Sequence, residues 1–395
     1  MQSTSVLISG ASIAGPTLAY WLARYGFDVT VVEKASGLRP GGQAVDFKGE
    51  THLTVLRRMG ILDDIRAAQT SGDDGVVVDA AGRTLAIVPR EFSGGELEIA
   101  RGDLARLLLD RTSATTEYVF GDSISTLTET ATGVDVTFDR AAPRTFDLVV
   151  GADGLHSNVR RLAFGPERDF VRHLGYYYAL AEVDVAGGSE LYGEPGRTAA
   201  TGGPKAPAFF VFASDPLTYD RDDVTKQKQL VATAYRGAGW RVPELLARLP
   251  GAREFYLDSI SRVTMDRYTN GRVALLGDAA YGNTLGGFGT GLAIVGAYVL
   301  AGELFRAGGD HRVAYARYEA FRDYAKVSQK VNAGTILAPR TRLGMHLRNV
   351  LFSTSFLFAP LMRLSDRFAT DIELEDYGLL VPGGLEVPEA DRTIG

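Results

Sequence analysis

Two aspartates stand directly behind short apolar runs, where a buried strand would present a carboxylate to a ligand. Asp153 follows the run Asp147-Leu148-Val149-Val150-Gly151-Ala152. Asp278 follows Gly271–Gly277 and is itself followed by two alanines, whose small side chains leave room for a ligand. Carboxylate oxygens accept hydrogen bonds from ligand hydroxyl groups, but they also cap helices. Taken singly, each aspartate is open to both interpretations.

A glycine-rich turn near the start of the chain could hold a phosphate. Gly10-Ala11-Ser12-Ile13-Ala14-Gly15 lies between an apolar run and an expected helix. Free backbone N–H groups and the positive end of the helix dipole favour a dinucleotide pyrophosphate at such a place. Ser12 stands where the usual motif has its second glycine. Glu33, at the end of the next expected strand, could accept hydrogen bonds from an adenosine ribose. The alternative is a generic glycine turn with a surface acid.

The elements that would position these groups follow from apolar periodicity. Residues 6–8 predict a buried strand, 14–25 a helix ended by Gly26, and 29–32 a second strand. This unit predicts a parallel sheet with a right-handed crossover. Further helices are expected at 52–59, 61–68, 104–109 and from about 292, and further strands at 97–99, 118–120, 134–138, 146–150 and 272–276.

The stretch 174–256 has a different character. Aromatic and β-branched runs at 176–178, 209–212 and 230–233 alternate with Gly/Pro turns, which is typical of an antiparallel sheet. From about residue 311 the pattern is mostly helical, and 350–364 predicts an apolar helix that Pro360 kinks or ends. The predicted units are a discontinuous parallel-sheet domain (1–72, 96–170 and 262–330), an antiparallel-sheet domain (73–95 and 171–261) and a C-terminal helical segment (331–395).

Composition excludes several classes of function. The 395 residues contain no cysteine, which excludes disulfides, thiolate metal sites and dithiol redox chemistry, so any redox work requires a bound cofactor. The 42 basic and 48 acidic residues give a net charge of −6, so no bulk positive field favours nucleic acid or an anionic membrane. The N-terminus has no basic region ahead of its apolar stretch, and we expect a soluble cytoplasmic protein.

The glycine turn, the Asp153 motif and the Asp278 motif, in this order and spacing along the chain, resemble the group A flavoprotein monooxygenases, which have the p-hydroxybenzoate hydroxylase fold. The resemblance extends from about Ser5 to about Arg306. It is strongest for the tetracycline-inactivating and polyketide-tailoring branch, on the segments 41–46, 98–104 and 295–304. It implies an α/β fold in which a Rossmann-like FAD-binding domain is interrupted by an antiparallel-sheet substrate domain.

The resemblance also implies a set of FAD-binding residues. Gly10, Ser12, Gly15 and Glu33 would hold the ADP half, Arg101 and Asp153 would face the cofactor, and Asp278 would bond the ribityl chain. Arg39 and the loop 41–46 would lie near the flavin ring, and the helix start after Gly286 would stabilise the anionic reduced flavin. The full set is Gly10, Ser12, Ile13, Ala14, Gly15, Glu33, Lys34, Arg39, Gln43, Asp46, Arg101, Asp153, Asp278, Gly289, Thr290 and Gly291. The alternatives are an exposed arginine at Arg101 and a flexible loop before a core helix at 286–291.

The activity implied is that of an FAD-dependent monooxygenase. NAD(P)H, a transient co-substrate, would reduce FAD, and O2 would form a flavin C4a-hydroperoxide that hydroxylates or oxygenates an aromatic or polycyclic substrate, polyketide- or tetracycline-like. Because the flavin carries this chemistry, no catalytic side chain and no metal ligand is expected. We expect a monomer or weak homo-oligomer in antibiotic biosynthesis or resistance, with neither nucleic acid nor membrane as a partner.

The segment after Asp278 departs from the family pattern. Tyr281 is present, but residues 282–291 contain no proline and are one residue shorter than the family loop. Two alternatives therefore stay open: a flavoprotein of the same fold that catalyses a redox-neutral cyclisation or uses FAD structurally, and a non-catalytic protein that binds aromatic ligands.

The histidines and aromatic runs give no catalytic pattern. Structural or surface roles are expected for His52, His156, His173, His311 and His346. The runs 176–178 and 209–212 are expected in the sheet core rather than in a substrate site.

Overall fold

A computed structural model describes residues 4–38, 44–70, 74–88, 97–202, 208–354 and 372–378, apart from the side chains of residues 327 and 328. Within these ranges, no helix combines the length and the apolar character that crossing a membrane requires. The described residues form four sheets, of which a six-stranded and a seven-stranded sheet are the largest.

The six-stranded sheet has the order β17-β18-β11-β1-β2-β7 and is parallel except for β17. Its strands are β1 (Ser5–Ser9), β2 (Asp28–Glu33), β7 (Glu117–Phe120), β11 (Leu148–Gly151), β17 (Thr269–Asn270) and β18 (Val273–Leu275). All residues of β11 and β18 are buried, as expected when both faces of a parallel sheet are covered. Because β11 and β18 are neighbours, the two aspartate motifs leave the sheet side by side.

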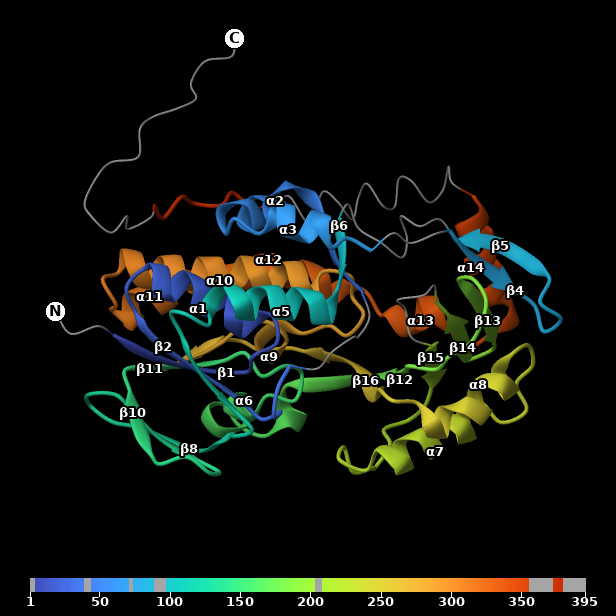
Figure 1. Cartoon of the computed structure of the whole chain (residues 1–395), viewed down its shortest axis with the longest axis horizontal. Helices are drawn as coiled ribbons and strands as arrows, with labels where there is room; N and C mark the ends of the chain where they lie inside the picture. Colours follow the sequence, from blue (N-terminus) through green and yellow to red (C-terminus); the bar gives the residue numbers. More distant parts are fainter. Residues whose placement is uncertain are drawn as a thin grey trace, which may run out of the picture.

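Helices cover this sheet in two layers (Figure 1). The layer on the sheet contains α1 (Ala14–Arg24), α5 (Arg101–Thr112) and α10 (Gly289–Arg306), and α1 packs against both others. Around it lie α2 (Gly49–Arg58), α3 (Leu62–Ala67), α11 (His311–Tyr318), α12 (Phe321–Ala325) and the 3-10 helix η3 (Lys326–Lys330). On the other side of the six-stranded sheet, at the bottom of Figure 1, are α6 (Asn158–Ala163) and an antiparallel sheet. This sheet consists of β8 (Ile124–Glu129), β9 (Val134–Phe138) and β10 (Arg144–Phe146), and the 3-10 helix η1 (Glu167–Asp169) follows α6 in the chain.

The seven-stranded sheet has the order β16-β12-β15-β14-β13-β4-β5, and only the β13–β4 pair is parallel. Its strands are β4 (Gly75–Val78), β5 (Thr84–Val88), β12 (Val171–Ala181), β13 (Glu190–Glu194), β14 (Arg197–Thr201), β15 (Ala208–Ala213) and β16 (Phe255–Val263). One face is covered by α7 (Val224–Ala234), α8 (Val242–Arg248) and η2 (Leu249–Gly251). Near the sheet lie α13 (Ala333–Leu337) and α14 (Arg342–Ser353), and two further strands, β3 (Ala44–Phe47) and β6 (Leu97–Ala100), pair with each other.

The α/β fold and the antiparallel sheet are confirmed, but some predicted elements are wrong in detail. Residues 230–233 belong to α7, because Asp223 caps the helix at Lys226 N and the buried residues Gln227 and Val231 recur at helical spacing. The strand predicted at 146–150 is divided between β10 and β11 at Asp147. The helix predicted at 350–364 overlaps only the last four residues of α14, which ends at Ser353. Residues 355–364 lie outside the described residues. The domain bounds stay a prediction.

Candidate functional site

The β1–α1 turn has no room for side chains at its first and last glycines. Gly10 has a φ of +108°, and a Cβ there would lie 2.5 Å from the carbonyl oxygen of Ala152. A Cβ on Gly15 would lie 1.9 Å from the carbonyl oxygen of Gly10. Ile13 and Ala14 are buried, and Ala14 begins α1. The turn is therefore packed between the start of α1 and the end of β11.

Glu33 fixes the same turn from the end of β2. Its carboxylate accepts hydrogen bonds from the backbone N–H of Ala11, at 2.8 Å, and of Ala35, at 2.9 Å. A carboxylate has about four acceptor positions, so Glu33 retains capacity for a ligand hydroxyl group. The next residue, Lys34, is exposed.

Arg101 reaches the turn from β6 and α5. It is the first residue of α5, and its guanidinium donates to the hydroxyl of Ser12 at 3.1 Å. Its side chain is exposed, as the alternative interpretation expected, yet it contacts the glycine turn. Asp46 is half-buried on β3, opposite Glu98 of β6. Arg39 and Gln43 were predicted beside the flavin ring and lie outside the described residues.

Asp153 bonds the first turn of the helix that follows it. Its carboxylate accepts from the backbone N–H groups of Asn158, at 2.8 Å, and Val159, at 3.0 Å, and from the Ser157 hydroxyl. Burial raises the pKa of this carboxyl, although these hydrogen bonds oppose the rise. The N-cap residue of α6 is Ser157, so Asp153 bonds the first turn of this helix from outside the cap position, and its contact with a cofactor stays a prediction.

Arg160 joins the two aspartate motifs. It is fully buried and donates to the backbone carbonyl groups of Leu155 and Ala279, at 2.5 and 2.8 Å. Ala279 immediately follows Asp278, so the loops after β11 and β18 are held together by one guanidinium.

Asp278 is placed differently from Asp153. The residue at the N-cap of α9 (Asp278–Tyr281) is Gly277, and the Asp278 carboxylate accepts no hydrogen bond from any residue of the described ranges. Its side chain is exposed, whereas Gly277 and Ala279 are buried. Desolvation by the surrounding protein nevertheless raises the pKa of its carboxyl, while the charge of Arg101 opposes that rise. An exposed carboxylate that accepts no hydrogen bond from the described part of the chain is expected of a residue that faces a ligand.

The first turn of α10 lies beside this carboxylate. A Cβ on Gly289 would be 3.5 Å from Asp278 Oδ1. Thr290 is half-buried, and Gly291 packs against the ring of His52, which a Cβ on Gly291 would meet at 2.2 Å. Because α10 begins at Gly289 rather than near Leu292, all three predicted residues belong to its first turn.

His52 is buried beneath that turn. Its Nδ1 accepts from the backbone N–H of Lys48 at 3.2 Å, and its Nε2 has no hydrogen-bond partner among the described residues. Burial lowers the pKa of His52 to about 4, so the imidazole is neutral at physiological pH. The expected structural role of this histidine agrees with its packing against Gly291.

The proline-free loop between α9 and α10 is held by hydrogen bonds to β16. The backbone N–H of Val263 donates to Gly282 O at 2.7 Å, and that of Thr284 donates to Ser261 O at 3.0 Å. Leu285 has a φ of +58°, which is a strained value for a residue with a side chain. These bonds fix the loop in place without the proline of the family pattern.

The loop faces aromatic residues of the seven-stranded sheet. Leu285, Tyr178 and Phe209 are all partly buried against one apolar cluster, in which Val211 and Ile260 are core members. Tyr177 and Phe212 point to the opposite face and pack in the core beneath α7 and α8. The runs expected in the core are therefore divided between the two faces of the sheet.

A polar cluster that no motif predicted joins the two large sheets. His156, from the loop after Asp153, approaches Glu167 with Nδ1 and Asp258 of β16 with Nε2, each at 3.0 Å. The Tyr256 hydroxyl donates to Asp258 at 2.8 Å. Sequence alone could not find this cluster, because its members are up to 102 residues apart and share no motif.

His156 makes stability depend on pH. Burial lowers its pKa, but hydrogen bonds to Asp258 and Glu167 outweigh burial and raise it above the ordinary value. The imidazolium therefore stabilises the fold below about pH 6.5, and this contribution is lost as pH rises through the folded-state pKa. We expect His156→Gln to cost about 1–3 kcal/mol at pH 6 and clearly less at pH 9 in urea unfolding. The exposed His346→Gln is the control, and equal costs at both pH values for His156→Gln would contradict the assignment.

A surface hollow of about 690 Å³ lies elsewhere, between β13, β4 and α14. It is lined by Tyr192, Met345 and His346 among others, and by none of the predicted site residues. The candidate site is therefore the region around the glycine turn, Asp278 and the start of α10.

Known proteins match this chain over most of its length. The family model described as FAD binding domain matches residues 3–313. The protein Rv1260 of Mycobacterium tuberculosis is 43% identical over 80% of this chain and 89% of its own length. A flavin-dependent monooxygenase of Legionella longbeachae is 37% identical over 83% of this chain and 88% of its own length. The crystal structure of tetracycline destructase Tet(51) has a TM-score of 0.82 and 29% identity, covering 95% of this chain and 100% of that one.

Proposed function

Because this chain belongs to the FAD-binding domain family and is an FAD-dependent monooxygenase, we propose that it uses NAD(P)H and O2 to oxygenate a phenolic aromatic or polycyclic small molecule. The observation that carries the proposal is Asp278, whose exposed carboxylate accepts no hydrogen bond from the described residues and lies beside the first turn of α10.

The ADP half of FAD fits the glycine turn. Gly10 and Gly15 leave no room for side chains, so the turn is held in one close-packed arrangement at the start of α1, where N–H groups favour a pyrophosphate. In our proposal the turn from Gly10 to Gly15, with Ser12, Ile13 and Ala14, holds the pyrophosphate. Glu33 then accepts from the adenosine ribose with its remaining lone pairs, and Lys34 lies beside it.

The flavin half fits the opposite end of the site. Asp278 accepts from a ribityl hydroxyl group, and Arg101 and Asp153 border the cofactor from the two sides. The first turn of α10, with Gly289, Thr290 and Gly291, directs its N–H groups at the flavin ring. In our proposal Asp46 lies near the ring, and the two further residues predicted there, Arg39 and Gln43, lie outside the described residues.

FAD, when bound, supplies the redox chemistry by accepting electrons from NAD(P)H and activating O2. The chain binds the cofactor, orients the substrate and excludes water. Tyr178, Phe209 and Leu285 form the apolar wall that a flat ring would contact. The similarity to a tetracycline destructase supports a tetracycline-like or polyketide-like substrate, and with it a role in antibiotic resistance or biosynthesis.

The test is NAD(P)H oxidation by the purified FAD-loaded protein, with and without a panel of tetracyclines and related polycyclic phenols. We expect at least one compound to stimulate oxidation and to gain one oxygen atom, as measured by mass spectrometry. Each compound is also incubated with free FAD and NAD(P)H as a control for uncatalysed oxidation. A compound that perturbs the flavin spectrum but draws no reductant and gains no mass would contradict the proposal for that class.

A further inference from the structure

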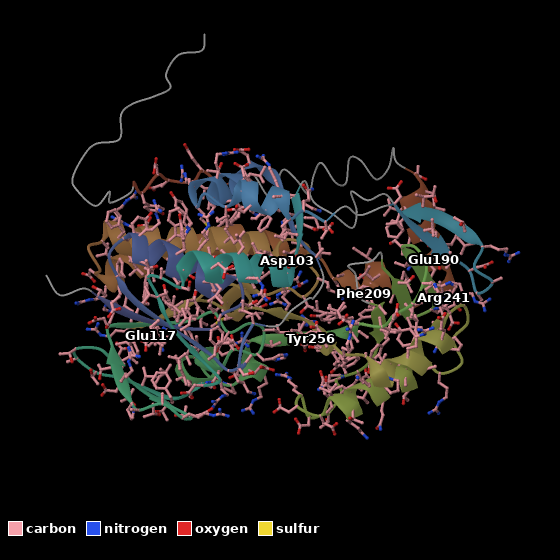
Figure 2. The ribbon with its side chains drawn as sticks, in the orientation of Figure 1. Asp103, Glu117, Glu190, Phe209, Arg241 and Tyr256 are labelled. Carbon is pink, nitrogen blue, oxygen red and sulfur yellow. The ribbon has the colours of Figure 1, made fainter. Side chains whose placement is uncertain are left out.

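The surface hollow between β13, β4 and α14, hereafter the α14 hollow, is not used by the proposed function. Its volume of about 690 Å³ is in the range of small-molecule sites, which is roughly 300–1,000 Å³. β13 lies two strands along the sheet from β15, which carries Phe209 of the proposed apolar wall. Figure 2 shows Phe209 between Glu117 of β7 and Glu190 of β13. The α14 hollow is therefore distinct from the proposed cofactor and substrate sites.

Most of the surface inside the α14 hollow is apolar. It comes from Val78 of β4, Leu85 of β5, Tyr192 of β13, and Met345 and Val350 of α14. Leu85 and Val350 are 54% and 42% exposed, so apolar surface is open to solvent here. A ligand with an apolar body would cover this surface.

Arg348 of α14 lies directly behind the lining of the hollow and is only 5% exposed. Its Nε and Nη2 donate to Asn349 Oδ1 at 3.2 and 3.0 Å, and its Nη1 donates to Leu337 O at 2.7 Å. Asn349 and Gly193 both line the hollow. A Cβ on Gly193 would lie 3.4 Å from Nη2 and 3.5 Å from Nη1. The space left by the missing side chain therefore adjoins the guanidinium.

The charge of Arg348 has no acid to balance it. A guanidinium has five N–H donors and three are used, so one on Nη1 and one on Nη2 have no acceptor among the described residues. Burial lowers the pKa of Arg348 to about 10, and no carboxylate acts on it, so the group stays charged at neutral pH. Because an unpaired buried charge is costly, this arrangement points to an anion that the described chain does not supply.

The acids that line the α14 hollow already have partners. Asp79 accepts from Arg83 Nε at 2.7 Å, and Glu194 accepts from Arg197 Nε, also at 2.7 Å. Arg342, which lines the hollow too, is exposed and forms no ion pair with any residue that the structure describes. Charge complementarity therefore favours a ligand with a negative group.

A structural role alone does not require the guanidinium. The Leu337 carbonyl, at the end of α13, would keep a partner without Arg348, because the Thr198 hydroxyl donates to it at 2.7 Å. Asn349 is half-buried, so its Oδ1 can bond to water instead. An apolar side chain in place of Arg348 would remove the cost of the buried charge and leave neither acceptor unpaired.

We propose that the α14 hollow binds a small apolar carboxylate. The apolar body of the ligand lies against Tyr192 and Val350. The carboxylate accepts hydrogen bonds from the two free N–H groups of Arg348, in the space beside Gly193, and Arg342 approaches it from the rim. The ligand thus supplies the counter-charge that the buried guanidinium lacks.

The experiment uses 2-naphthoate as the probe and 2-naphthamide as its uncharged analogue, each titrated into the FAD-loaded protein by isothermal titration calorimetry. We expect naphthoate to bind about tenfold more tightly than naphthamide, or better, because hydrogen bonds to charged groups contribute about 1.5–3 kcal/mol. Arg348→Met should remove this difference and leave the melting temperature unchanged or higher. Arg348→Lys, which keeps the charge, should retain part of it.

A second pair of variants tests the place of binding without changing a buried group. Val350→Trp fills the hollow and should prevent the charge-dependent binding. Leu347→Trp is the matched control, because Leu347 is 59% exposed on the same helix and does not line the hollow. This pair decides the matter if Arg348→Met does not fold.

Three results would overturn the proposal. The first is no saturable naphthoate binding up to the solubility limit, and the second is equal affinity for naphthoate and naphthamide. The third is naphthoate binding that Arg348→Met and Val350→Trp leave at wild-type strength, since the probe would then bind elsewhere. None of these measurements involves NAD(P)H oxidation, so they stand or fall independently of the proposed function.

Discussion

Replacing Gly15 with alanine is expected to lower the free energy of unfolding by about 3 kcal/mol or more and to abolish FAD binding. The added Cβ would lie 1.9 Å from the carbonyl oxygen of Gly10, and this atom belongs to backbone that cannot rotate away. Either the turn opens or α1 moves off the sheet. In both cases the N–H groups of the turn lose their arrangement, so the loss of FAD accompanies the loss of stability.

The matched control is Gly37→Ala, because a Cβ on Gly37 would meet no atom within 4 Å. Its effect should stay within about 0.5 kcal/mol. Urea unfolding of both variants gives the stabilities, and the quenching of FAD fluorescence on binding gives the affinities. If Gly15→Ala were as stable as Gly37→Ala, the close packing between turn and helix would be refuted.

The parts of the fold that could be predicted from sequence are those that local pattern determines. The run at 6–8, the helix after it and Glu33 form a contiguous unit, so periodicity and motif both identify it, and the structure agrees. The segment 230–233 shows the limit of local pattern. Its β-branched residues favour a strand, but the cap at Asp223 and the burial of Val231 beneath the sheet favour a helix. Tertiary packing overrides a weak intrinsic preference here.

The candidate site, like the fold, contains some residues that local sequence predicts and others that only the structure reveals. Asp153 and Asp278 have the same local context in sequence, a buried strand followed by a small residue. Only the structure shows that Asp153 bonds the start of α6, whereas Asp278 accepts no hydrogen bond from any residue that the structure describes. Asp258 and His156 could not be paired from sequence, because they are 102 residues apart and come together only when β16 and the loop after β11 are placed by the fold. Local motifs predict the cofactor residues, whereas the cluster of His156, Glu167 and Asp258 depends on contacts between distant segments.

Replacing Asp278 with alanine is expected to weaken FAD binding by about 10- to 100-fold without destabilising the apoprotein. A hydrogen bond to a charged group contributes about 1.5–3 kcal/mol, which corresponds to a change of roughly 10- to 100-fold in the dissociation constant of FAD. In the apoprotein the carboxylate has no hydrogen bond within the described residues, and desolvation raises its pKa, so its charged form is disfavoured where it stands. Its removal should therefore leave the free energy of unfolding unchanged or slightly higher.

Asp153→Ala provides the contrast, because the Asp153 carboxylate bonds two backbone N–H groups of α6. Loss of these bonds should cost about 0.5–2 kcal/mol of stability in the apoprotein itself. Thermal unfolding of the two apoproteins and FAD titration of both variants distinguish a residue that serves the ligand from one that serves the fold. If Asp278→Ala retained FAD at wild-type affinity, Asp278 would not bond the ribityl chain, and the position of the flavin beside α10 would have to be assigned anew.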